Sequence, residues 1–301
     1  MRRRRTSRPT RLLQNGESSV SRGPESYVQL SMLSPESYSA GGGAVCVFTG
    51  PSPVPGRVNE DSAGVIPCGE DRGFFVVADG MGGCPDGEQA SKIAIETFQL
   101  YLADSDPDED LHESIMAAFQ EANRRIEKHA AGSGTTVVAA YYDGDMIRTY
   151  HCGDSRALLV ADRGKIKLRT LDHSPVAEAV ERGLLTAEQA MHHHQRHYVS
   201  NFMGSEEMRV DVSDPVRVAS RDTLVLASDG LFDNLMDREV IEELKQRNIR
   251  RVTQRLIDLS RDRMRRGDRI GKASKPDDLT VVVFRPHRKA SERPASPGRG
   301  R

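Results

Sequence analysis

The sequence predicts an α+β fold in which helices pack on antiparallel sheets. First, residues 135–171 contain short apolar stretches separated by tight turns, which is the pattern of an antiparallel meander. Second, stretches with helical periodicity occur in pairs between the groups of strands, as expected when helices cover the faces of sheets.

The two ends of the chain differ from its middle. Residues 1–26 begin with MRRRRTSRPTR, which holds six arginines, and residues 287–301 are rich in Arg, Pro, Ser and Gly. Neither segment can bury enough apolar surface to offset the entropy lost on ordering. We therefore expect a disordered basic N-terminal arm, one folded region at 27–286 and a disordered C-terminal tail. The arm could also contact RNA, lipid or an acidic partner.

Composition narrows the function classes. The net charge of −1 does not predict a nucleic-acid binder, and no apolar stretch approaches the length of a membrane span. The basic N-terminus has no apolar segment behind it, so we do not expect a secretory signal. The four cysteines, at positions 46, 68, 84 and 152, form no CxxC pair. Reduced thiols in a cytoplasmic protein fit this pattern.

The expected elements follow from apolar periodicity and turn residues. In the first half of the chain we expect strands at 27–33, 44–49 and 74–79, loops at 34–43 and 50–56, and helices at 87–103 and 109–131. In the second half we expect strands at 135–142, 146–152, 157–161, 166–171, 222–228 and 279–284, and helices at 237–246 and 251–265. The polar segment 172–204 between them is expected to form a partly helical surface flap.

Aspartates lie at the ends of three apolar runs. Asp79 follows FFVVA, Asp229 follows LVLAS, and Asp277 and Asp278 come directly before LTVVVF. Any one of them could be a turn or helix-cap residue. Together, with no Lys or Arg expected to pair with them, they predict carboxylates that converge on a cation. Oxygen ligands without a Cys/His set favour Mg²⁺ or Mn²⁺ over Zn²⁺.

Three other patterns are weaker. The glycines at 80, 82, 83 and 87 could form a phosphate cradle, but no Gly-Lys-Ser/Thr follows and Glu88 would repel phosphate. The histidines at 192–194 and 197 could suggest zinc, but consecutive side chains point in different directions, so a surface role is expected. Cys152 lacks the CxxxxxR spacing of a phosphate-binding nucleophile.

Seven short motifs resemble those of one enzyme family, and they occur in order along the chain. They are NEDS at 59–62, ADGMGG at 78–83, GSGTT at 132–136, CGDSR at 152–156, LDHS at 171–174, SDGLFD at 228–233 and DDLT at 277–280. Together they resemble the metal-dependent type-2C (PPM) serine/threonine protein phosphatases of the bacterial style. The resemblance covers about residues 44 to 285.

This resemblance implies a four-layer α/β/β/α sandwich, with two antiparallel sheets flanked by helices. It implies two Mn²⁺ or Mg²⁺ ions, with matching positions for a third. Asp79 would bridge the first two ions, and the carbonyl of Gly80 would bind one of them. Asp229 and Asp277 would hold the other. Asp154 and Asp233 match the positions of a third, weaker ion.

The resemblance also implies catalytic residues. Asp61, together with Glu60, would accept hydrogen bonds from metal-bound waters. Asp278 would lie near the cluster without necessarily binding it. An arginine that grips phosphate is usual five residues before the match to Asp61; here that position is Gly56, and Arg57 is one residue out of register.

Another departure concerns the proton donor. Animal members have histidine where this chain has Met81, and a methionine cannot donate a proton. Bacterial members commonly have methionine there too, which leaves protonation of the leaving group to a water or to another residue.

The expected function is hydrolysis of phosphoserine and phosphothreonine in proteins, with the phosphorylated substrates of a Ser/Thr kinase as partners. The core is not expected to bind nucleic acid, and the protein is not expected to bind a membrane. The rival interpretation is a non-catalytic module that senses phosphoprotein or metal on a degenerate fold. A third is an enzyme specific for a small phosphoester or one regulatory phosphoprotein, with the flap at 172–204 setting the preference.

Overall fold

The computed structural model describes residues 22–81, 86–106, 109–267 and 273–287. Most of the expected arm at 1–26, and all but the first residue of the expected tail at 287–301, lie outside the described residues. Strand β1 begins at Glu25, two residues before the expected start of the folded region. None of the described helices is both long enough and apolar enough to cross a membrane.

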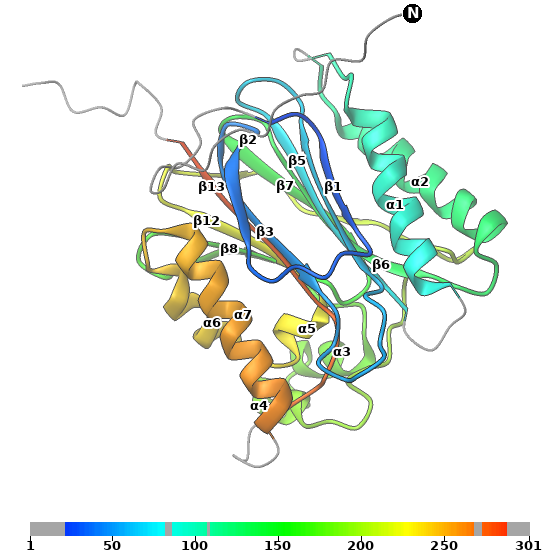
Figure 1. The fold of residues 1–301 in the computed structure, drawn as a ribbon, viewed down its shortest axis with the longest axis vertical. Helices are drawn as coiled ribbons and strands as arrows, with labels where there is room; N and C mark the ends of the chain where they lie inside the picture. The colour runs from blue at the N-terminus through cyan, green and yellow to red at the C-terminus, as the bar shows by residue number, and fades with distance from the viewer. Residues whose placement is uncertain (1–21, 82–85, 107–108, 268–272, 288–301) are drawn as a thin grey trace, which may run out of the picture.

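Two antiparallel sheets form the centre of the molecule (Figure 1). The first sheet has the order β1-β4-β5-β6-β7-β10, with β11 also paired to β7. Its strands are β1 (Glu25–Val28), β4 (Asp61–Pro67), β5 (Gly73–Gly80), β6 (Thr135–Tyr142), β7 (Met146–Cys152), β10 (Asp211–Val212) and β11 (Val216–Arg217). The second sheet has the order β2-β3-β13-β12-β8-β9. Its strands are β2 (Glu36–Ala40), β3 (Gly43–Gly50), β8 (Arg156–Val160), β9 (Ile166–Arg169), β12 (Thr223–Ala227) and β13 (Leu279–Pro286).

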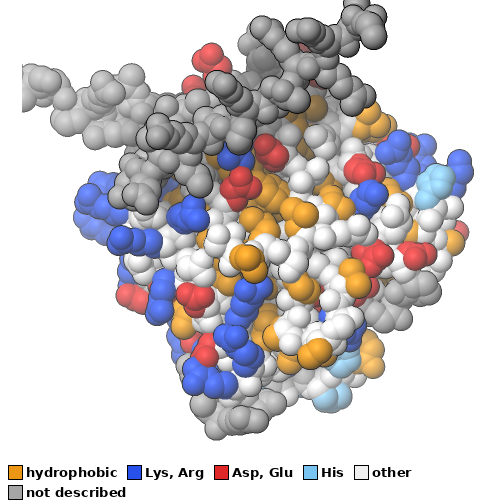
Figure 2. Space-filling view, in the orientation of Figure 1, with side chains coloured by type: hydrophobic (Ala, Val, Ile, Leu, Met, Phe, Trp, Pro, Cys, Tyr) orange, Lys and Arg blue, Asp and Glu red, His pale blue; other side chains and the backbone are white. Residues whose placement is uncertain are grey.

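Helices cover the outer faces of both sheets. Helices α1 (Gly87–Leu102) and α2 (His112–His129) pack on the first sheet through a core that includes Phe74, Phe98 and Phe119. On the second sheet lie α5 (Asp229–Phe232), α6 (Asp237–Leu244) and α7 (Ile249–Arg266). Figure 2 shows Lys and Arg side chains gathered over α7 on its solvent face, as expected for an amphipathic helix.

The two sheets face each other across a separate apolar layer. Phe75 from the first sheet stacks on Phe284 from the second, with ring centroids 4.4 Å apart. Because alternate residues of a strand point to opposite faces, the neighbours of Phe75 on β5 pack instead against α1 and α2. The four-layer α/β/β/α sandwich predicted from the sequence is confirmed.

Some predicted elements were wrong in type or extent. The segment 34–43, expected to be a loop, contains β2, an edge strand that buries Tyr38 and Ala40 against the core. The first strand ends at Val28 rather than Leu33, and Gln29 after it adopts a positive φ of 51°. Helix α2 begins at His112, not at residue 109.

The flap segment 172–204 is partly helical, as predicted. It contains α3 (Pro175–Glu181) and α4 (Ala187–Met191). Ser174 caps α3 by accepting a hydrogen bond from the N–H of Ala177, and Thr186 forms a capping box with Gln189 on α4. Both helices lie beside α5, at the end of the sandwich where the aspartates gather.

Candidate metal centre

The predicted aspartates come together where strands of the two sheets end. Asp61 starts β4 and lies opposite Asp79 in the register of β4 and β5. In the other sheet, Asp229 follows β12 and Asp277 precedes β13, and β12 and β13 are paired neighbours. The convergence predicted from the sequence is therefore a property of the fold.

Asp61 is the most enclosed of these carboxylates, with 1% of its surface exposed. Its Oδ2 accepts a hydrogen bond from the hydroxyl of Ser228 at 2.8 Å, which connects the two sheets. Its Oδ1 is buried and has no hydrogen-bond donor among the described residues. Burial raises the pKa of Asp61 well above its usual range, and Asp278 adds to the effect. A buried carboxylate oxygen without a hydrogen-bond donor can accept a hydrogen bond from water or bind a cation.

Asp79 and Gly80 are held by close backbone packing. The hydroxyl of Thr135 donates to the carbonyl of Asp79 at 2.8 Å. A Cβ added at Gly80 would lie 2.3 Å from the carbonyl oxygen of Gly87 and 2.7 Å from that of Glu60, so only glycine fits there. Burial raises the pKa of Asp79 well above its usual range, and the negative charges of Asp61 and other aspartates raise it further.

Asp229 and Asp233 lie one turn apart on and just after α5, on the side of Asp277. Burial and then the charge of Asp229 raise the pKa of Asp233 to about 7 and that of Asp277 to about 6. The Oδ2 of Asp233 is buried and accepts no hydrogen bond from the described residues, but it forms an ion pair with the ammonium of Lys275 at 3.5 Å. Asp154, on the turn between β7 and β8, is 8% exposed, and burial followed by Asp229 raises its pKa strongly.

A lysine lies among these carboxylates, which corrects the expectation that no Lys or Arg pairs with them. The ammonium of Lys275 contacts Asp229 directly, and lies 3.0 Å from Asp277 and 3.5 Å from Asp233. No apolar run or turn pattern marks Lys275 in the sequence, although it stands only two positions before Asp277. The Lys275 charge partly offsets the rise in the pKa of Asp233 and Asp277.

The donor set fits divalent cations of the Mg²⁺ and Mn²⁺ type. All the candidate side-chain ligands are carboxylates, and the buried Oδ1 of Asp61 has no hydrogen-bond donor among the described residues. Burial, followed by the charges of the neighbouring carboxylates, raises the pKa of Asp79 and Asp154, and a bound cation would relieve that repulsion. The assignment of individual ligands to individual ions stays a prediction.

Glu60 and Arg57 lie at the edge of the cluster. The half-buried Glu60 has its Oε1 next to Gly87, where an added Cβ would be 2.8 Å away. Burial raises the pKa of Glu60 and Asp278, and the positive charge of exposed Arg57 lowers both. Asp278 has a backbone-binding role: its carboxylate accepts from the N–H groups of Ser52 and Glu60, each at 2.7 Å.

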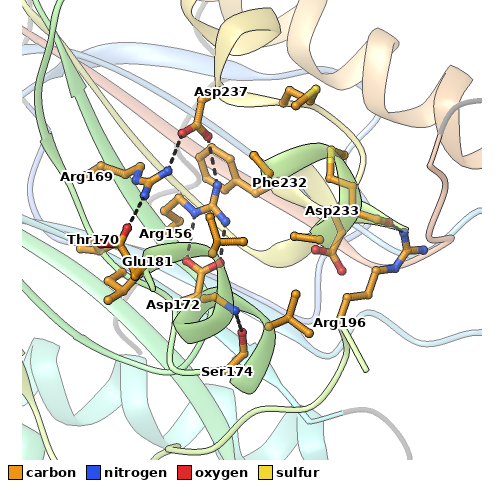
Figure 3. A pocket seen from close by; sticks show the side chains of 18 of the residues that line it. Arg156, Arg169, Thr170, Asp172, Ser174, Glu181, Arg196, Phe232, Asp233 and Asp237 are labelled. Carbon is orange, nitrogen blue, oxygen red and sulfur yellow. Dashed lines mark hydrogen bonds and ion pairs between the residues drawn. The ribbon is translucent and has the colours of Figure 1, made fainter. Parts of the chain in front are cut away.

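A cavity of about 220 Å³ adjoins the aspartates beneath the flap (Figure 3). Asp233 forms part of its wall, together with apolar side chains from α3, α4 and α5. Arg156 lies beside it, paired with Asp172 and, at 3.0 Å, with Asp237, and packed 4.6 Å from the centre of the Phe232 ring. The flap is thereby joined to α5 and α6.

Arg196 makes a second connection from the flap. Its guanidinium donates to the carbonyl of Met191 and, at 2.6 Å, to that of Ser274, directly before Lys275. The neighbouring histidines at 192, 194 and 197 are exposed and His193 is half-buried. The expected surface role of these four residues agrees with that exposure.

His151, His173 and Asp211 form a different group of possible metal ligands, the only one among the described residues whose ligand atoms lie within 4.8 Å of one another. The aspartates above are spaced more widely. Nδ1 of His173 accepts from the N–H of Gly153 at 3.0 Å and from the amide of Asn201 at 2.8 Å.

A neutral His173 with Nδ1 as acceptor must carry its proton on Nε2, 3.1 Å from Asp211, so Nε2 has no lone pair for a metal. His173 also donates its backbone N–H to the carbonyl of Gly153 at 2.9 Å. Its role is therefore to hold the turn that carries Asp154. Sequence reasoning did not identify this role, because the partner is a backbone group.

Comparisons with known proteins agree with this geometry. Residues 54–263 match the family model described as protein phosphatase 2C. The serine/threonine protein phosphatase PstP of Mycobacterium tuberculosis is 33% identical over 217 residues, covering 70% of this chain and 40% of that protein. The chain therefore spans less than half the length of this relative.

Solved structures show the same fold. Serine/threonine phosphatase Stp1 from Staphylococcus aureus has a TM-score of 0.70 at 27% identity, covering 80% of this chain and 94% of that one. The catalytic domain of PstP in complex with two manganese ions has a TM-score of 0.65 at 27% identity, covering 80% and 96%. The predicted family resemblance is confirmed.

Proposed function

Because the chain belongs to the protein phosphatase 2C family, we propose that it hydrolyses phosphoserine and phosphothreonine in proteins with the help of Mn²⁺ or Mg²⁺. The observation that supports this most is the meeting of Asp61, Asp79, Asp229 and Asp277 at one end of both sheets. The PstP catalytic domain in complex with two manganese ions supports the choice of metal.

Each residue has a role in this proposal. Asp79 and the carbonyl of Gly80 hold one side of the metal centre, and Asp229 and Asp277 hold the other. Asp154 and Asp233 offer ligands for a third ion. When bound, the cations lower the pKa of a water nucleophile and neutralise charge on the phosphate.

The remaining groups orient the reactants. Oδ1 of Asp61 can accept a hydrogen bond from the attacking water, since Oδ2 is already bonded to Ser228. Glu60 lies beside it in sequence and provides a second acceptor on the same rim. Arg57 is exposed near Glu60 and can pair with the phosphate of a protein substrate.

We further propose that the substrates are the targets of a Ser/Thr kinase and that the protein is cytoplasmic. Cys46, Cys68 and Cys152 are free and buried, which suits a reducing compartment. The cavity under the flap adjoins Asp233, so residues that flank the phosphorylated side chain would meet the flap.

The test is phosphate release from phosphopeptides by the purified protein with Mn²⁺. We expect Asp79→Asn and Asp229→Asn to reduce kcat by about a thousandfold or more, the scale of losing a catalytic electrostatic group. Asp258→Asn, on the exposed face of α7, is the control and should retain activity. Folded protein that binds Mn²⁺ without turnover would instead support the non-catalytic module.

A further inference from the structure

Lys275 is placed among the aspartates by a rigid backbone contact. Its N–H donates to Oδ1 of Asn234 at 3.0 Å, and its carbonyl accepts from Nδ2 of the same residue at 2.9 Å. Asn234 is fully buried and also donates to the carbonyl of Gly230 on α5. The backbone of Lys275 is therefore fixed relative to the helix that carries Asp229.

The side chain of Lys275 ends among the carboxylates of Asp229, Asp233 and Asp277, which together form a carboxylate cage. The ammonium has three donors, and it contacts Asp229, lies 3.0 Å from Asp277 and 3.5 Å from Asp233. Its side chain is 21% exposed. A lysine is ordinarily protonated at neutral pH, so the group carries a positive charge among the three carboxylates.

All three carboxylates are predicted metal ligands: Asp229 and Asp277 hold one side of the metal centre, and Asp233 offers a ligand for a third ion. A divalent cation bound by carboxylates takes oxygens at about 2.0–2.2 Å, so it cannot share the cage with an ammonium that already contacts Asp229. The positive charges of the Lys275 ammonium and of a cation bound to the same carboxylates would also repel each other. A lysine has a flexible four-carbon stem and can leave while its backbone stays fixed.

We propose that Lys275 is a built-in competitor of the divalent cation: its ammonium neutralises Asp229, Asp233 and Asp277 until a cation displaces it. This inference rests on the metal centre of the proposed function. Two consequences follow. The ammonium stabilises the fold without metal, and it weakens the affinity for the cation on this side of the centre.

The first experiment measures metal affinity and stability rather than turnover. Mn²⁺ is titrated by calorimetry into the wild type, Lys275→Gln and a control, Lys245→Gln, whose exposed lysine pairs only with Glu242 among described residues. We expect Lys275→Gln to increase the Mn²⁺ affinity of the site at Asp229 and Asp277 by about tenfold or more, since one like charge is removed. Its Tm in chelator should fall, and the gain in Tm on adding Mn²⁺ should exceed that of the wild type. The control should show neither change.

A second measurement uses the wild type, so it does not depend on whether the variant folds. Lysines are acetylated with and without Mn²⁺, and the modified peptides are quantified by mass spectrometry. We expect the acetylation rate of Lys275 to rise several-fold with Mn²⁺, because the displaced ammonium meets solvent, while that of Lys245 stays constant. Equal rates at Lys275 in both conditions would overturn the inference, as would an unchanged or weaker Mn²⁺ affinity in Lys275→Gln.

These outcomes are separate from the test of the proposed function. Mn²⁺ that displaces Lys275 in a protein without turnover would support the inference and refute the proposed activity. Turnover by a protein in which Lys275 is acetylated at the same rate with and without Mn²⁺ would support the proposed activity and refute the inference. Absence of Mn²⁺ binding in both the wild type and Lys275→Gln would refute both.

Discussion

The hydroxyl of Ser228 donates to Oδ2 of Asp61 at 2.8 Å and, through the same oxygen, accepts the backbone N–H of Thr280 at 3.0 Å. One buried side chain thus connects a metal-centre residue of the first sheet to the start of β13 in the second. The orientation of Asp61 depends on a contact between sheets rather than on its own strand.

Replacing Ser228 with alanine should therefore affect both stability and turnover. The buried Thr280 N–H and Asp61 Oδ2 would lose their partner, which costs about 1–3 kcal/mol in the free energy of unfolding. We expect kcat to fall by about tenfold as Asp61 loses its orientation. Urea unfolding and phosphopeptide kinetics measure the two effects.

Ser260→Ala is the matched control, since Ser260 is fully buried and its hydroxyl has no hydrogen-bond partner among the described residues. That variant should be neutral or slightly more stable. If Ser228→Ala behaved like Ser260→Ala in both assays, the hydrogen bonds of Ser228 would contribute neither to stability nor to turnover.

Arg57→Ala should weaken substrate binding more than it slows the chemical step. Arg57 is exposed and lies near Glu60 and Asp278, where its positive charge opposes the rise of both carboxyl pKa values. A phosphate contact at the surface contributes about 1.5–3 kcal/mol, so we expect KM to increase by about tenfold or more.

Steady-state kinetics on a phosphopeptide separate KM from kcat for this variant, and Arg163→Ala, an exposed arginine on the turn after β8, serves as its control. Equal KM values for the two variants would assign the phosphate contact to another group.

His173→Ala should loosen the turn at Gly153 that carries Asp154. It removes the acceptor for a buried backbone N–H, which costs about 1–3 kcal/mol. His173→Asn keeps an acceptor near the position of Nδ1 and should recover part of that loss. We expect the order of thermal stability to be wild type, His173→Asn, His173→Ala.

Calorimetry with Zn²⁺ provides an independent check on His173. The wild type should show no tight Zn²⁺ binding that is lost in His173→Asn, because Nε2 of this histidine carries a proton. Tight binding lost only in the histidine variants would identify the cluster with His151 and Asp211 as a metal site after all.

The buried thiols should be inert. Burial raises the pKa of Cys46 and Cys68 to about 11 and that of Cys152 to about 12. Because the thiolate is the nucleophile, iodoacetamide near pH 8 should leave these residues unmodified in the folded protein and modify them in guanidinium chloride. Peptide mass spectrometry distinguishes the sites.

The sign of the pH effect follows from the direction of these shifts. A thiol with a raised folded pKa stabilises the protein fully below its unfolded pKa of about 8.5, and this contribution is lost as the pH rises towards about 11. The free energy of unfolding should therefore decline in alkaline solution. Fast alkylation of any of the three in the folded protein would show that its surroundings open to solvent.

Much of the aspartate cluster could be predicted from the sequence because its residues stand at fixed places relative to strands. Asp79, Asp229 and Asp277 each adjoin an apolar run, and a buried strand leaves its terminal residue little freedom. The four-layer arrangement came from the ordered motifs rather than from periodicity, which does not specify how sheets stack.

What escaped prediction depends on contacts between distant segments. Lys275 was overlooked because its partners Asp229 and Asp233 lie more than forty positions earlier in the chain. Strands β10 and β11 are two residues long, too short for any periodicity. Strand β2 is an edge strand, and only Tyr38 and Ala40 mark its buried face.

The hydrogen bond from Arg196 to the carbonyl of Ser274 joins the flap to the stretch that carries Lys275 and Asp277. In the proposed function, cation binding at Asp277 and the position of the flap are therefore linked through this one hydrogen bond.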